Sequence, residues 1–163
     1  MRFKDFYKDN FILLDEATIN DLRSDTDTAR IKRSRPIATH YQSISKGGII
    51  SFDSTAITTT NIDFWQQIIK PTVRLTKNMS LKDFRSAFNS DIKVNCNCPD
   101  FLYKGFKYMG SEEDYLYGRK EKRFPIIKNP TLSGSICKHL FNCLGILKAS
   151  APKILHDFRM HFK

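Results

Sequence analysis

The stretch "KVNCNCPDF", residues 93–101, decides the fold of this chain together with "SICKHL", residues 135–140. Each stretch contains two metal-binding side chains with one residue between them. Residues i and i+2 of an extended segment point the same way, so Cys96 and Cys98 can face one ion. Cys137 and His139 lie at the entry to an apolar helix, where a non-helical cysteine and a first-turn histidine can face the same ion. Zinc in structural sites takes four thiolate or imidazole ligands in a tetrahedron. The sequence therefore predicts a closed zinc site whose ligands are Cys96, Cys98, Cys137 and His139.

The remaining cysteine, Cys143, lies in an apolar helical pattern beside Leu144, which fits a small buried side chain. It also follows His139 by four residues and shares a helical face with it, so replacement of one ligand by Cys143 is the alternative. Disulfides are disfavoured, because Cys96 and Cys98 are too close to pair and clustered Cys and His indicate a metal.

Length and composition indicate one globular domain with room for extensions, because 163 residues with 40% hydrophobic content do not supply two large cores. The formal net charge of +10, from 27 Lys and Arg against 17 Asp and Glu, favours acidic or polyanionic partners. No segment approaches the roughly 18–20 apolar residues of a membrane span, and the charged start "MRFKDFYKDNF" does not suit a secretory signal. We expect a protein that is not secreted, has no membrane partner and stays in a reducing interior.

The chain pattern predicts an α+β fold: a small antiparallel sheet with a zinc-clamped knuckle, a long insert and a C-terminal helix. A turn at residues 46–48, "KGG", favours a hairpin, since glycine supplies positive φ. Helical patterns occur over 78–91, with Ser80 and Asp83 as a capping box, and from about Cys137 to a break at Pro152 as the last ordered element. The β-prone runs are 40–45, 49–54, 56–75 and 92–96.

The N-terminal part differs in composition from the rest. One or two short helices are expected within residues 1–23, followed by a polar and then basic arm or linker over 24–40. We divide the chain into an N-terminal helical segment with a basic arm, residues 1–38, and a zinc-binding α+β domain, residues 39–163.

Basic side chains in the arm and in the insert, residues 99–136, are the candidate contacts to nucleic acid or to a partner protein. In the insert they alternate with aromatic residues, as a single-stranded nucleic-acid platform requires. The alternatives are that the aromatics pack the insert onto the knuckle and that the arm is a solvated linker. The candidate residues are Arg30, Lys32, Arg33, Arg35, Lys104, Lys107, Arg119, Lys120, Lys122 and Arg123.

Enzyme motifs are not apparent in the sequence: it has no Gly-rich phosphate loop, no G-x-S-x-G elbow and no H-E-x-x-H helix. The Cys and His pairs suit a metal better than a nucleophile with its base. We therefore expect a protein that is not an enzyme.

The pattern "CNCP…CKHL" resembles the SWIM-type zinc finger, C-x-C-P followed by C-K-H, and the resemblance makes Cys96, Cys98, Cys137 and His139 the zinc ligands. The chain departs from that family at Asn142, where a small residue is common, and in its long insert of about 38 residues. The segments "SRPIATHYQSISKGGIISF", "DIKVNCNCPDFLYKGFKY" and "RFPIIKNPTLSGSICKHL" extend the similarity to small zinc-knuckle proteins of tailed bacteriophages.

Two functional hypotheses follow. The resemblance implies a non-enzymatic, zinc-stabilised structural or adaptor protein of a tailed-phage virion, in the head, neck or tail assembly, with other virion proteins as partners. It would be found in the virion, or in the host cytoplasm during assembly. The alternative is a SWIM-type nucleic-acid-binding protein that acts in DNA handling or transcription, which the net charge and the basic insert favour.

Overall fold

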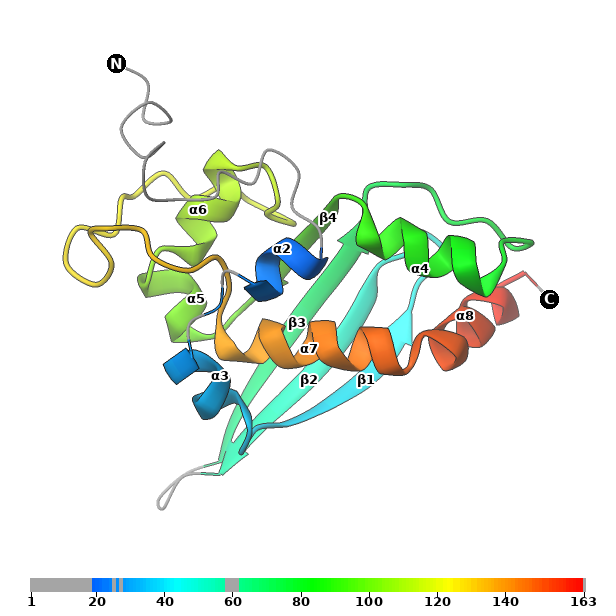
Figure 1. The fold of residues 1–163 in the computed structure, drawn as a ribbon, viewed down its shortest axis with the longest axis horizontal. Helices are drawn as coiled ribbons and strands as arrows, with labels where there is room; N and C mark the ends of the chain where they lie inside the picture. The colour runs from blue at the N-terminus through cyan, green and yellow to red at the C-terminus, as the bar shows by residue number, and fades with distance from the viewer. Residues whose placement is uncertain (1–18, 25, 27, 58–61, 163) are drawn as a thin grey trace.

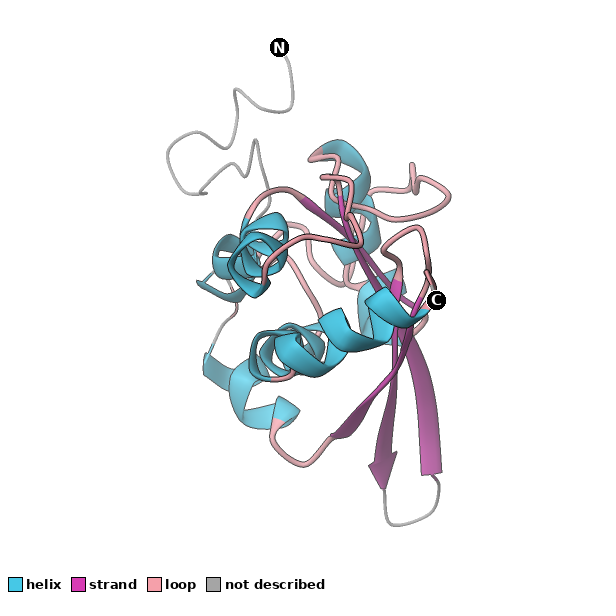
Figure 2. Cartoon of the chain, turned by 90° about the vertical axis from the view of Figure 1, so that its right-hand side faces the viewer, coloured by secondary structure: helices cyan, strands magenta, loops and turns pink. Residues whose placement is uncertain are grey.

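The chain folds around one antiparallel sheet, and the computed structural model describes residues 19–24, 26, 28–57 and 62–162. The strand order in the sheet is the order in the sequence, β1-β2-β3-β4. Figure 1 shows a long helix, α7 (Lys138–Ala149), crossing the strands, and Figure 2 shows this helix packed on one side of the sheet. The α+β class with an antiparallel sheet is thereby confirmed. The strands are β1 (Ala38–Ile44), β2 (Ile50–Ile57), β3 (Ile62–Pro71) and β4 (Ile92–Cys96).

The core lies between the sheet and the helices. Strand β4 alternates as a strand with one buried face should, since Ile92, Val94 and Cys96 are buried while Lys93 and Asn95 are half-buried. The inward side chains of the other strands meet the apolar side of α7 in a single cluster. That cluster includes Ile44, Ile50, Phe52, Ile69, Leu140, Leu144 and Leu147.

Two local predictions are confirmed at the atomic level. The turn between β1 and β2 contains Gly48 at φ 78°, and the Ser45 amide donates to the Ile49 carbonyl at 2.8 Å. Helix α4 (Leu81–Asn89) begins with the capping box: the Asp83 amide donates to Ser80 Oγ at 3.1 Å, and the Ser80 amide donates to Asp83 Oδ2 at 3.2 Å.

The predicted end of the chain is wrong in one respect. Helix α7 stops before Pro152 as expected, but a further helix, α8 (Ala151–Met160), follows it directly. Proline is tolerated in the first turn of a helix, because its missing N–H would have no intrahelical partner there. Ile154 and Phe158 of α8 are fully buried, so this helix extends the core instead of ending it.

The predicted arm or linker is also wrong over part of its length. Residues 19–24 form α2 (Ile19–Ser24), which lies almost wholly in the stretch expected to be helical, whereas the basic run expected to be a linker forms α3 (Thr28–Ser34) ahead of Pro36. The Asn142 side chain on α7 donates to the carbonyls of Ser34 and Ile37, at 2.8 and 3.3 Å, which ties the end of α3 to α7. The expected helices before residue 19 lie outside the described residues.

The insert contains two helices that the sequence pattern did not predict, α5 (Pro99–Tyr103) and α6 (Phe106–Glu112). Both are short, which leaves little periodicity to detect. Gly105 joins them at φ 79°, and a side-chain Cβ there would clash with the Pro125 ring. No described helix combines the length and apolar character required to cross a membrane.

Candidate metal centre

Four donor atoms from two distant parts of the chain meet in the core. The sulfur atoms of Cys96, Cys98 and Cys137 and one His139 ring nitrogen all lie within 4.8 Å of one another. Metal bonds of about 2.0–2.3 Å put tetrahedral ligands roughly 3.3–3.8 Å apart, so side-chain adjustments on the order of 1 Å would close this set around one ion. The structure thus contains the predicted cluster, which could hold a metal ion.

The first two ligands are positioned by the end of a strand and the start of a helix. Cys96 is the last residue of β4, and Cys98 is the N-cap of α5, whose first turn contains Pro99. The Phe101 amide donates to Cys98 Sγ at 3.3 Å, so this sulfur already accepts one hydrogen bond that stabilises negative charge.

The other two ligands are positioned by the start of α7. Cys137 is the N-cap, with extended backbone at φ −76° and ψ 165°, and His139 lies in the first helical turn. The N-terminus of a helix carries partial positive charge, which favours the thiolate form of a cysteine placed there. This arrangement, a non-helical cysteine followed by a first-turn histidine, is the one that the sequence predicts.

The burial of the cluster fits a metal better than it fits four free side chains. Cys98 and Cys137 are 0% exposed, Cys96 is 1% and His139 is 2%. Neither ring nitrogen of His139 has a hydrogen-bond partner among the described residues. A buried polar atom without a partner is costly, and coordination of an ion would satisfy one of these nitrogens.

The thiols do not ionise equally. Burial raises the pKa of the Cys96 thiol, but donation from the Cys137 and Cys98 thiols and from the Gln67 amide outweighs it and lowers that pKa. Burial and the neighbouring sulfur atoms raise the pKa of Cys137 well above its usual range. A cation is therefore needed before all three sulfur atoms can be anionic together, and its binding must release protons.

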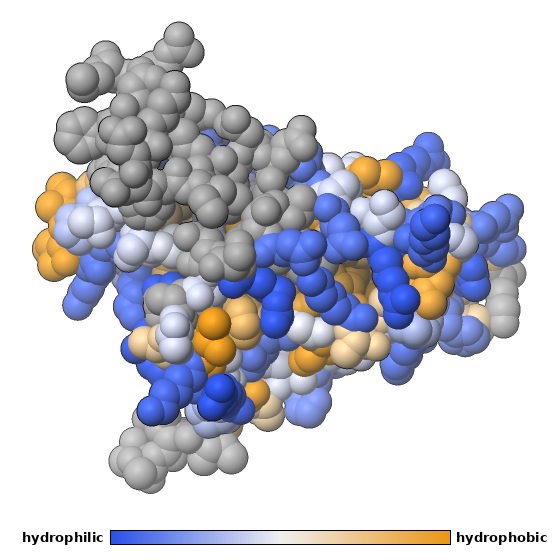
Figure 3. Space-filling view, viewed as in Figure 1, coloured by the Kyte–Doolittle hydropathy of each residue, from blue (hydrophilic) through white to orange (hydrophobic). Residues whose placement is uncertain are grey.

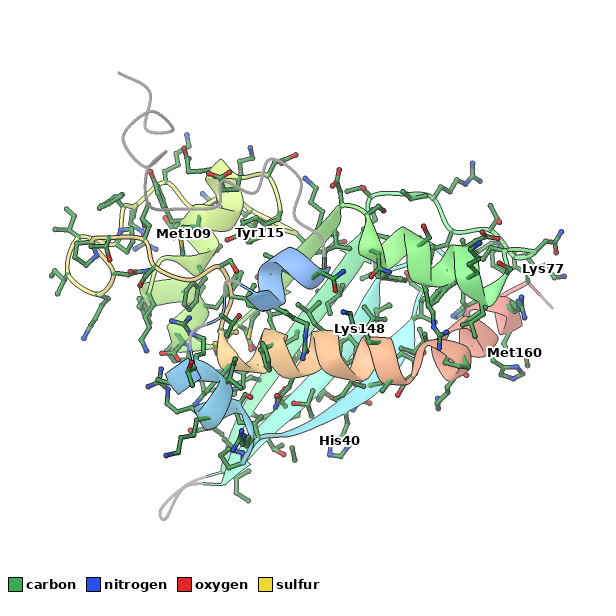
Figure 4. All side chains as sticks on the ribbon, viewed as in Figure 1. His40, Lys77, Met109, Tyr115, Lys148 and Met160 are labelled. Carbon is green, nitrogen blue, oxygen red and sulfur yellow. The ribbon has the colours of Figure 1, made fainter. Side chains whose placement is uncertain are left out.

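Cys143 does not belong to the cluster. Its side chain is fully buried within α7, and its thiol donates to Gln67 Oε1 at 3.4 Å. Burial raises the pKa of the Cys143 thiol well above its usual range, which suits a neutral donor. Of the two interpretations of Cys143, the geometry favours the buried structural residue. His40 lies exposed on β1 and points away from the core (Figure 4).

The basic residues of the predicted arm are now divided between core and surface. Arg30 is 7% exposed and its guanidinium stacks on the Phe106 ring at 4.6 Å, so this cation is part of the packing between α3 and the insert. Lys32, Arg33 and Arg35 are exposed.

Five basic residues of the insert line one hollow, whereas Lys104 lies outside it. Lys104 pairs with Asp100 at 3.1 Å, and Arg123 pairs with Glu121 at 2.8 Å. Arg123 holds the pKa of the Glu121 carboxyl at about 2. The hollow is lined by Lys107, Arg119, Lys120, Glu121, Lys122 and Arg123.

Most aromatic residues of the insert pack inward. Phe101, Phe106 and Tyr115 are at most 2% exposed, and the Tyr115 hydroxyl donates to the Ser135 carbonyl at 3.0 Å (Tyr115 is labelled in Figure 4). Tyr108 and Phe124 stack edge to face with centroids 5.5 Å apart. Tyr103, by contrast, is 63% exposed, and Tyr117 is half-buried. The packing interpretation therefore accounts for these rings better than a base-stacking platform does.

Sequence reasoning missed Gln67, which is 1% exposed and donates through Nε2 to Cys96 Sγ at 3.7 Å. The available signal was a polar residue at an inward position of the apolar run "DFWQQII". The pairing of Gln67 with Cys96 depends on the register between β3 and β4, which the sequence pattern does not specify.

Comparison with known proteins found no match among protein-family models, curated proteins or solved structures. The similarity to SWIM-type and phage zinc-knuckle proteins therefore depends on the sequence motifs themselves, and the structure adds the spatial cluster that those motifs predict.

Removal of one ligand should remove the metal. We expect elemental analysis of the purified protein to give about one metal ion per chain, and Cys96→Ser or His139→Ala to give far less. Each variant should lose at least about 3 kcal/mol of unfolding free energy, because metal binding to such a site contributes to folding. Denaturant titration monitored by circular dichroism measures this loss.

The matched control is Cys143→Ser, which changes a buried thiol of the same helix outside the cluster. It should retain about one metal ion per chain. A wild-type protein that folds fully without metal, or a Cys143→Ser variant that alone loses it, would contradict the assignment.

Proposed function

We propose that this protein is a non-enzymatic, zinc-stabilised adaptor, and that it serves as a structural or assembly component of a tailed-phage virion. The observation that carries the first part is the buried Cys3His cluster, in which all four ligands are at most 2% exposed. Four protein ligands complete a tetrahedral shell and leave no position for water or substrate, as in structural sites and unlike catalytic ones.

Zinc is the ion that this donor set suits best. Thiolates are soft ligands and select zinc over calcium or magnesium, which prefer oxygen. Three thiolates with one imidazole is among the common structural zinc sets. The ion would connect the end of β4 and the start of α5 to the start of α7.

An adaptor needs a rigid contact surface, and the insert offers one. Figure 3 shows an apolar group at the left-hand end of the molecule, where Figure 1 draws the loop between α6 and α7. In that loop Ile126 is 72% exposed and Ile127 is 88% exposed, next to the exposed Lys128. Large apolar side chains at the tip of a loop are typical of contacts with another protein.

The loop is held in place on both sides of this tip. Before it, Phe124 stacks on Tyr108 and Pro125 lies against Gly105. After it, the buried Asn129 donates to the carbonyls of Lys104 and Ser133, at 3.0 and 3.1 Å. A surface that is ordered before binding loses less conformational entropy on binding, which favours a role in assembly.

The virion assignment is supported by the similarity of three segments to phage zinc-knuckle proteins and by the surface just described. If it is correct, mass spectrometry of purified particles of the encoding phage should detect the protein at a fixed copy number. Absence from particles would contradict the virion role.

A surface variant tests the adaptor role more finely. The double substitution Ile126→Asp and Ile127→Asp should leave folding and metal content unchanged but lower incorporation into particles at least tenfold, since charge at an apolar contact costs several kcal/mol. Ile62→Asp is the matched control, because Ile62 is also 72% exposed but belongs to β3. Equal incorporation of both variants would contradict a contact through the loop.

Nucleic-acid binding is the second candidate, and the hollow lined by five basic residues and Glu121 favours it. Because the insert aromatics are mostly packed, contact would be made through phosphates and would be sequence-independent.

The salt dependence of binding distinguishes the nucleic-acid-binding function from the adaptor function. Fluorescence polarisation with a single-stranded and a duplex oligonucleotide should show affinity that falls steeply with salt, because each neutralised phosphate releases counterions. Lys120→Glu with Lys122→Glu should weaken binding at least tenfold, whereas Lys77→Glu, an exposed lysine elsewhere, should have a smaller effect. Binding that does not respond to salt or to these substitutions would exclude the hollow as the nucleic-acid-binding site.

A further inference from the structure

Polar side chains cross the core face of the sheet in a hydrogen-bonded row, one from each strand. Thr39 Oγ1 on β1 and Ser54 Oγ on β2 are 3.0 Å apart. Ser54 Oγ donates to Gln67 Oε1 on β3 at 2.8 Å, and Gln67 Nε2 donates to Cys96 Sγ on β4 at 3.7 Å. The row therefore ends on one of the four metal-ligand candidates.

This row lies in apolar surroundings. Ser54 is 0% exposed and Gln67 is 1% exposed, and Phe52 and Ile69, which flank them on the same strands, are both 0% exposed. A buried carboxamide is costly unless its donors and acceptors are used. Apolar residues would fill the same space without that cost, so the presence of Gln67 calls for a role beyond packing.

The orientation of the Gln67 carboxamide is determined by its neighbours. Its oxygen accepts from two groups, the Ser54 hydroxyl at 2.8 Å and the Cys143 thiol at 3.4 Å. The opposite orientation would place oxygen lone pairs against the Cys96 sulfur, which is anionic when it binds a metal. Both constraints direct the N–H group to the sulfur.

We propose that Gln67 is a positioning residue for the metal site, which orients the Cys96 sulfur and withdraws negative charge from it through an N–H···S hydrogen bond. Partners that hydrogen-bond to metal ligands orient them and tune how tightly the ion is held. Ser54 and Cys143 act indirectly, because their hydrogen bonds to Oε1 fix the orientation of the Gln67 carboxamide. The inference depends on the metal site alone and is independent of the adaptor and nucleic-acid roles.

The test uses the full chain loaded with cobalt(II), a spectroscopic substitute for zinc. Gln67→Leu keeps the approximate volume but removes the donor. Without the hydrogen bond the sulfur lone pairs rise in energy, so the sulfur-to-cobalt charge-transfer band should move to longer wavelength. For the zinc-loaded variant, release to excess chelator should be about tenfold faster or more.

Two further variants separate positioning from packing. Gln66→Leu is the matched control, since Gln66 is the exposed neighbour on the opposite face of β3, and it should leave the band and the release rate unchanged. Ser54→Ala should shift the band in the same direction by a smaller amount, which provides a readout if Gln67→Leu does not fold.

The proposal is overturned if Gln67→Leu lowers thermal stability but leaves the band and the release rate at wild-type values. It is also overturned if Gln67→Leu does not fold and Ser54→Ala shifts neither quantity. A wild-type protein that binds neither cobalt nor zinc would instead overturn the zinc assignment itself, so the two failures are distinguishable.

Discussion

The contact on which the rest of the structure depends is the meeting of two ligand pairs that are about 40 residues apart in sequence, at the end of β4 and the start of α7. Closing a long loop costs conformational entropy, and short helices such as α5 and α6 have little stability of their own. One ion bound by both pairs would offset this cost, and it would fix the position of the insert relative to the sheet. The loop that carries the exposed Ile126 and Ile127 lies between the two ligand pairs, so its placement would depend on that anchoring.

The buried metal-ligand cluster and the exposed surface of the insert differ in the interactions that they can make. The cluster is buried and offers four ligands of its own, which is a complete tetrahedral shell for one ion. Recognition has to come from exposed groups, which the insert concentrates: apolar side chains at the loop tip and cations around the hollow. The zinc-stabilised adaptor that we propose, with a basic contact surface, would unite these two features.

Sequence patterns predicted the features that have a local cause. Each of the two ligand pairs, the capping box at Ser80 and Asp83, and the glycine turn before β2 are specified by residues close together in the chain. The sequence pattern predicts a linker where α3 forms, and it does not show the distant residue Asn142, which donates a hydrogen bond to the end of this helix. Gln67 could not be recognised as a neighbour of Cys96, since their contact arises from strand register and burial.

The central claim, that these four residues bind zinc, is tested most directly by X-ray absorption at the zinc edge of the purified protein. The account predicts three sulfur neighbours at about 2.3 Å and one nitrogen at about 2.0–2.1 Å. A shell of oxygen ligands, or of four sulfur atoms that would require Cys143, would contradict it.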